Sequence, residues 1–177
     1  MQDGFSILSR RRLLRGSLAA GGFLFMGGLG LWALRGRASR VEGLRSLTDH
    51  EHRTLSALAR ALFPSGGAFA FGSEQAGLER AFDGFLADEP EWNRADLKRA
   101  LFLLEYGPVI FEARPRTFSN LSEAERLAHF QRWSESRTLI RRQVALAFRK
   151  FLSLVFYDQP AAWPGIGYPG PLTLAGR

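Results

Sequence analysis

Apolar residues spaced three and four positions apart are the feature of this sequence that most restricts its fold. The clearest stripe consists of Val144, Ala147, Phe148, Phe151, Leu152 and Val155. These positions share one face of an α-helix, and the same spacing recurs in segments 55–62, 78–85 and 97–104. No convincing run alternates apolar and polar residues as a half-buried strand would. The sequence therefore predicts an all-α bundle of about five helices over residues 41–157.

Local signals predict where these helices begin and end. Thr48 with Glu51, and Ser122 with Glu125, have the spacing of capping boxes that open the first and fourth helices. The first helix should stop at Pro64, and the second should cover residues 74–87. Asn93 is the predicted cap of the third helix. That helix should end at Gly107-Pro108, because glycine and proline commonly follow a helix C-terminus.

The positive charge of the chain is concentrated in its first forty residues. That segment contains seven arginines and a single acidic residue, Asp3. Removing these from the totals of 24 basic and 17 acidic residues leaves 17 basic and 16 acidic residues in the rest of the chain. A nucleic-acid-binding domain would keep a basic excess of its own. The sequence therefore predicts no nucleic-acid partner.

Residues 1–40 have the layout of an export signal, a basic stretch followed by an apolar one. Ser9, Arg10, Arg11, Leu13, Leu14 and Arg15 resemble the twin-arginine consensus, and Gly16–Leu34 contains no charged residue. This signal predicts recognition by the twin-arginine translocase and a periplasmic location. Nineteen residues of helix could also just cross a bilayer core of about 30 Å, so a cleaved signal and an uncleaved inner-membrane anchor both remain open.

The last segment, residues 158–177, differs in composition from the helical body. It combines prolines and glycines with Trp163 and Tyr168, and prolines disfavour both helix and regular strand. We expect an extended ribbon from which Trp163, Ile166 and Tyr168 project. Such a ribbon can fold back on its own bundle or lie in a groove of a partner, where a stiff segment loses little entropy on binding. The residues expected to contact a partner are Tyr157, Asp158, Pro160, Trp163, Pro164, Ile166, Gly167, Tyr168, Gly170 and Pro171.

No motif in the sequence predicts catalysis or a cofactor held by this chain. The glycine pattern that begins at Gly165 lacks the preceding strand and following helix of a dinucleotide site. His50 and His52 point to different sides of a helix, so they cannot easily share one metal ion. Glu105, Tyr106, Glu112 and Arg114 surround Gly107-Pro108 without a spacing specific to an active site. The absence of cysteine excludes thiolate catalysis, iron–sulfur clusters and c-type haem attachment.

Three features together resemble the gluconate 2-dehydrogenase subunit 3 family. They are the twin-arginine signal, the opening segment from Leu47-Thr48-x-x-Glu51 to Leu62-Phe63-Pro64, and the C-terminal motif. The motif reads Phe156-Tyr157-Asp158-x-Pro160-x-x-Trp163-Pro164-x-Ile166-Gly167-Tyr168-x-Gly170-Pro171, and it is the most specific of the three.

The resemblance implies a non-catalytic small subunit bound to a large FAD-dependent dehydrogenase of the glucose-methanol-choline type. The small subunit's signal would export the folded, FAD-loaded partner, and a cytochrome c subunit often receives the electrons. FAD is thus expected in the partner and no cofactor in this chain. The alternative from the residues alone is a stand-alone periplasmic or membrane-tethered helical protein that binds haem or a metal through His50, His52 or His129.

Overall fold

The computed structural model describes residues 34, 36–66 and 70–171, so the twin-arginine residues Ser9 to Arg15 lie outside the described part. The chain divides into two units, Met1–Gly36 and Arg37–Arg177.

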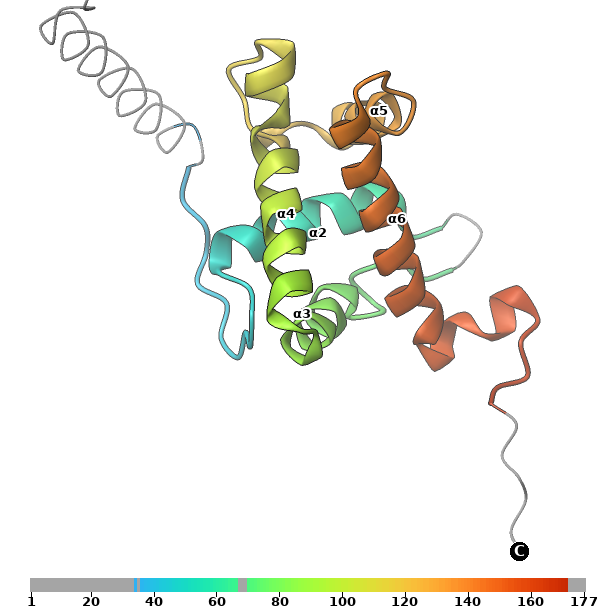
Figure 1. The fold of residues 1–177 in the computed structure, drawn as a ribbon. Helices are drawn as coiled ribbons and strands as arrows, with labels where there is room; N and C mark the ends of the chain where they lie inside the picture. The colour runs from blue at the N-terminus through green and yellow to red at the C-terminus, as the bar shows by residue number, and fades with distance from the viewer. Residues whose placement is uncertain (1–33, 35, 67–69, 172–177) are drawn as a thin grey trace, which may run out of the picture. The chain divides into compact units, whose positions relative to one another are not determined.

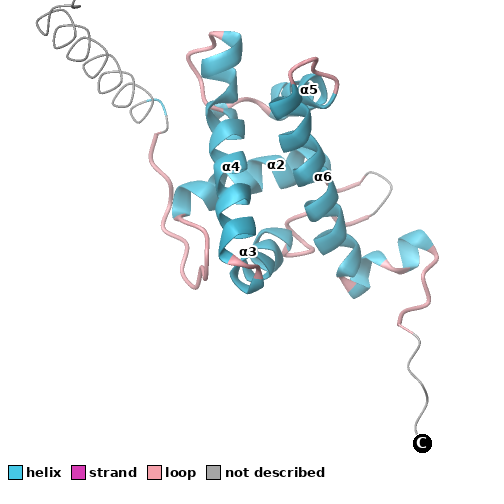
Figure 2. Ribbon diagram, in the orientation of Figure 1, coloured by secondary structure: helices cyan, strands magenta, loops and turns pink. Residues whose placement is uncertain are grey.

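The described part of Arg37–Arg177 is helical, and Figure 2 shows no strand in it, which confirms the all-α prediction. It contains five α-helices and three short 3₁₀ helices. The α-helices are α2 (Asp49–Leu62), α3 (Leu78–Asp88), α4 (Glu91–Glu112), α5 (Glu123–Ser134) and α6 (Leu139–Asp158), and the 3₁₀ helices are η1 (Phe118–Asn120), η2 (Pro160–Ala162) and η3 (Pro164–Ile166). In Figure 1, α4 and α6 run side by side while α2 crosses behind them and contacts α3, α4 and α5.

Both predicted capping boxes are present. The Thr48 hydroxyl accepts a hydrogen bond from the backbone N–H of Glu51, and the Glu51 carboxylate accepts one from the backbone N–H of Thr48. Ser122 and Glu125 repeat this arrangement at the start of α5. Hydrogen bonding to Ser122 lowers the pKa of the Glu125 carboxyl. Each box satisfies backbone donors that a helix start leaves without partners.

The core lies where the five α-helices meet, and it uses the apolar positions that the periodicity selected. Leu55, Leu58, Phe82, Leu101 and Phe148 are at most 1% exposed. Ala147 and Phe151, at the edge of the α6 stripe, are only half-buried. An acidic side chain fixes the chain before α2, because the buried Asp83 carboxylate accepts hydrogen bonds from the backbone N–H groups of residues 45–47.

Three predicted helix boundaries are wrong. The second helix begins at Leu78 rather than residue 74, and Asn93 does not cap α4, whose N-cap is Pro90. The larger error is at Gly107-Pro108, because α4 continues through both residues to Glu112. A Cβ atom on Gly107 would lie 2.3 Å from Cζ2 of Trp133. The glycine therefore admits the Trp133 ring of α5 against the backbone of α4, and it does not end the helix.

No helix among the described residues is both long enough and apolar enough to cross a membrane.

Candidate functional site

The C-terminal motif forms a compact turn rather than the extended ribbon that its prolines predicted. After α6 ends, η2 and η3 follow in succession, and each begins with a proline. The φ of proline, near −65°, suits the first position of a helical turn, where its missing N–H costs nothing. Proline therefore starts these 3₁₀ turns instead of preventing them. In Figure 1 this segment extends beyond the end of α6.

Trp163 organises the turn. Its indole Nε1–H donates a hydrogen bond of 3.1 Å to the backbone oxygen of Tyr157, and its ring meets the Tyr168 ring edge-on at 5.4 Å between centroids. The backbone N–H of Tyr168 donates to the Trp163 oxygen at 2.9 Å. Gly170 packs so closely that a Cβ atom there would lie 3.2 Å from the Trp163 ring. These contacts hold the turn in one shape.

The turn presents apolar side chains to solvent. Ile166 is 49% exposed, Tyr168 44% and Tyr157 39%. Among the other residues expected at an interface, Trp163 is half-buried and Gly170 is buried beneath it, while Asp158, Pro160, Pro164, Gly167 and Pro171 are exposed. Ala162 is fully buried in the core. The segment is therefore attached to the bundle through η2 while the side chains of Ile166 and Tyr168 face outward.

Phe156 brings the opening and C-terminal motifs into contact. Its ring stacks on Phe63 at 4.5 Å and on Phe71 at 5.5 Å between centroids. The loop after α2 is closed by a hydrogen bond from the backbone N–H of Ser73 to the Phe63 oxygen, 2.9 Å long. A Cβ atom on Gly72 would lie 2.7 Å from that same oxygen, so glycine is needed there. Sequence reasoning did not find this contact, because nothing local pairs residue 63 with residue 156.

The polar residues around Gly107-Pro108 separate into two groups. The carboxylate of the buried Glu105 accepts hydrogen bonds from the Thr54 hydroxyl and from the Ser119 hydroxyl and backbone N–H. Tyr106 is buried on the neighbouring position of α4, where its ring lies 4.7 Å from that of Phe102. These contacts join α4 to α2 and η1.

Glu112 belongs to the second group, a cluster of charged side chains at the end of α4. Its carboxylate lies 2.9 Å from Arg132, 3.4 Å from Arg114 and 2.9 Å from Nδ1 of His129. His129 is fully buried against Trp133 and Phe118. Neither of its ring nitrogens has hydrogen-bond geometry to a partner in the described part of the chain. Burial lowers the pKa of His129 to about 4, because it outweighs the attraction of the Glu112 carboxylate.

The other two histidines lie in the first turns of α2 and are half-buried. Burial also lowers the pKa of His52. Within residues 34, 36–66 and 70–171, no three histidine, aspartate or glutamate side chains are grouped as metal ligands would be.

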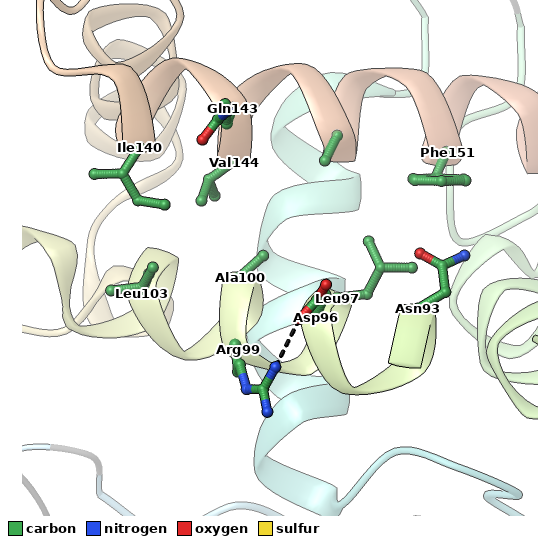
Figure 3. A pocket seen from close by; sticks show the side chains of 11 residues that line it. Asn93, Asp96, Leu97, Arg99, Ala100, Leu103, Ile140, Gln143, Val144 and Phe151 are labelled. Carbon is green, nitrogen blue, oxygen red and sulfur yellow. Dashed lines mark hydrogen bonds and ion pairs between the residues drawn. The ribbon is translucent and has the colours of Figure 1, made fainter. Parts of the chain in front are cut away.

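A groove between α4 and α6 is a feature that sequence reasoning missed. It encloses about 420 Å³, and Figure 3 shows Leu97, Ala100 and Leu103 of α4 opposite Ile140, Val144 and Phe151 of α6. Asn93 and Gln143 also line it, as does Asp96, which pairs with Arg99 at 2.6 Å. Helical spacing assigned most of these apolar residues to the core. It could not show that α4 and α6 leave a groove between them.

Comparison of this chain with protein-family models, curated proteins and solved structures finds no match.

Proposed function

We propose that this chain is the non-catalytic small subunit of a periplasmic flavin dehydrogenase. Its twin-arginine signal would export the complex, and its body would stabilise a large catalytic subunit of the glucose-methanol-choline type. FAD would be held by that large subunit, and a cytochrome c subunit is a further possible partner. The proposal rests on the resemblance of the signal, of the opening segment and of the C-terminal motif to the gluconate 2-dehydrogenase subunit 3 family.

The structural observation that carries the proposal is the exposure of the C-terminal motif. Ile166 and Tyr168 lie on a turn held by the Trp163 hydrogen bond and ring contact, and both are more than two-fifths exposed. Aromatic anchors on a preformed segment bind at low entropic cost and often dominate the energy of an interface. A turn built from these contacts therefore suits attachment to another protein.

The export role follows from joining this surface to the N-terminal signal. A twin-arginine signal directs folded proteins across the membrane, so a subunit carrying such a signal can take a bound partner with it. The partner must then attach to the body before export, and a rigid attachment surface serves this purpose. Substrate chemistry would belong to the large subunit.

The test is purification of the tagged full chain from its native host under gentle conditions. A co-purifying protein several times its mass, with flavin absorbance, is the expected result. Replacing both Ile166 and Tyr168 by alanine should lower the recovery of that protein by about tenfold or more, as loss of interface anchors does. Leu127→Ala is the matched control, because Leu127 is 39% exposed on α5. A lone, colourless chain would contradict the proposal.

A further inference from the structure

The groove between α4 and α6 continues into a strip of exposed apolar side chains along α6. Leu139 is 59% exposed, Ile140 43%, Leu146 67% and Leu154 57%. Tyr157, 39% exposed, continues the strip toward the C-terminal turn. Twenty residues of α-helix span about 30 Å, so one face of the molecule carries apolar side chains over that length. Surfaces of this extent commonly mark interaction sites.

The charges on α6 are unbalanced. The helix carries Arg141, Arg142, Arg149 and Lys150 but only one acidic residue, Asp158. None of the four basic side chains is ion-paired with a carboxylate in the described part of the chain. Elsewhere such pairs do form, as between Arg45 and Asp88.

The local contacts of these basic side chains are to groups without a negative charge. Arg142 donates to the Ser136 backbone oxygen and Arg149 to the Ser134 hydroxyl. Arg141 stacks over Phe111 and Lys150 lies near the Phe151 ring. The first turn of α6 also contains no acidic residue to complement the positive end of the helix dipole. The exposed strip thus combines apolar contact area with positive charge.

We infer that the α4–α6 groove receives an acidic amphipathic helix of the partner subunit, which deepens the function proposed above and rests on it. The apolar side chains of that helix would enter the groove, and a carboxylate on its flank would pair with Lys150, which lies three residues after Ala147 and against the Phe151 ring at the edge of the groove. Charge complementarity of this kind selects partners and fixes their orientation.

The shape of the site favours a helix over a membrane surface. The apolar lining lies between two neighbouring helices, and this is the geometry in which a third helix packs with side chains at three- and four-residue spacing. Ala100 on α4 and Ala147 on α6 both line the groove with small side chains. They leave room for larger side chains to enter. A bilayer surface would contact the protruding side chains of the strip but would leave the recessed groove unfilled, since Leu97 and Val144 in its lining are each only 3% exposed.

The absence of cysteine from the sequence makes the inference directly testable. The single cysteine of Ile140→Cys would measure how accessible the groove is to a labelling reagent. If that variant folds poorly, Leu154→Cys would measure the accessibility of the strip instead. Leu127→Cys on α5 is the control, because its 39% exposure closely matches the 43% of Ile140. The rate of maleimide labelling is measured for each full-length variant alone and in the purified flavin complex.

Formation of the complex should slow labelling of Ile140→Cys about tenfold or more while leaving Leu127→Cys unchanged. Equal labelling of both variants in an intact flavin complex would overturn the groove inference and leave the proposed function standing. If no flavin protein co-purifies, the proposed function fails and the inference with it. Slowed labelling of Ile140→Cys by phosphatidylglycerol vesicles, without slowing in the complex, would assign the strip to a membrane and overturn the inference.

The charge component has its own test. Lys150→Glu should weaken the complex about tenfold at low salt, with a smaller loss at high salt, where charge pairs are screened. Arg116→Glu, in the loop after α4, is the control of equal sign and exposed position. Equal affinities for the reversed variant and the control would contradict an acidic partner.

Discussion

Replacing Gly107 with alanine tests whether this residue is a packing site. Alanine in the interior of a helix normally stabilises a protein by roughly 0.5–1 kcal/mol relative to glycine. At Gly107 the added Cβ atom would lie 2.3 Å from Cζ2 and 3.0 Å from Cη2 of Trp133, and 3.2 Å from Nε2 of His129. Both neighbours are fully buried in α5, so neither can move without displacing the core.

The expected net effect of Gly107→Ala is destabilising. Overpacking a well-filled core costs roughly 1–3 kcal/mol, which exceeds the helix-propensity gain. We expect the free energy of unfolding to fall by about 1–2 kcal/mol, measured by urea denaturation followed by far-ultraviolet circular dichroism. The melting temperature should fall by a few degrees, on the order of 2–6 °C.

Gly84→Ala is the matched control. Gly84 also lies inside a helix, α3, and the nearest group to an added Cβ atom is the flexible end of Arg45, 3.8 Å away. This variant should gain roughly 0.5–1 kcal/mol. Gly107→Ala should also cost less in a Trp133→Phe background, because a smaller ring relieves the overlap. If Gly107→Ala stabilises the protein as much as Gly84→Ala, the close approach of Trp133 to α4 is wrong.

Two further predictions concern buried polar groups. His129 has a pKa of about 4 in the folded chain against an ordinary value of 6.5, so the unfolded chain binds its proton first as the pH falls. His129 should therefore remove up to roughly 3 kcal/mol of stability between pH 6.5 and pH 4, and His129→Phe should flatten that part of a stability–pH curve; an unchanged slope would contradict a buried neutral imidazole. Asp83→Ala should lower the free energy of unfolding by about 2–3 kcal/mol, because three backbone N–H groups of residues 45–47 lose their acceptor. Hydrogen exchange should quicken at those three amides, and continued protection would refute this anchoring role.

The parts of the fold that were predictable from sequence are those that depend on local chemistry. The capping boxes at Thr48 and Ser122 need only residues three positions apart, and both formed as expected. The apolar stripes likewise depend on helical periodicity alone. Leu55, Leu101 and Phe148 are buried where the periodicity placed them.

The errors arose where a distant residue decides the role of a local one. Local sequence signals predict a helix end at Gly107. Its actual role is set by Trp133 of α5, whose ring lies against it. The prolines of residues 160–171 predicted an extended segment without regular structure. Two of them instead occupy the first positions of η2 and η3, and the Trp163 hydrogen bond stabilises the resulting turn. The groove could not be predicted, because it depends on how α4 and α6 pack against each other, and no local pattern in either helix sets that packing.

The contact between Phe63 and Phe156 has a consequence for the order in which the protein can be completed during synthesis. The two rings are separated by most of the body in sequence, yet they stack directly. The end of α2 therefore cannot reach its final packing until the ribosome has made nearly all of α6. Export by the proposed folded-protein route would then have to wait for the whole chain, although its signal emerges first. The core and the C-terminal turn, which we propose binds the partner, are therefore both completed late in translation.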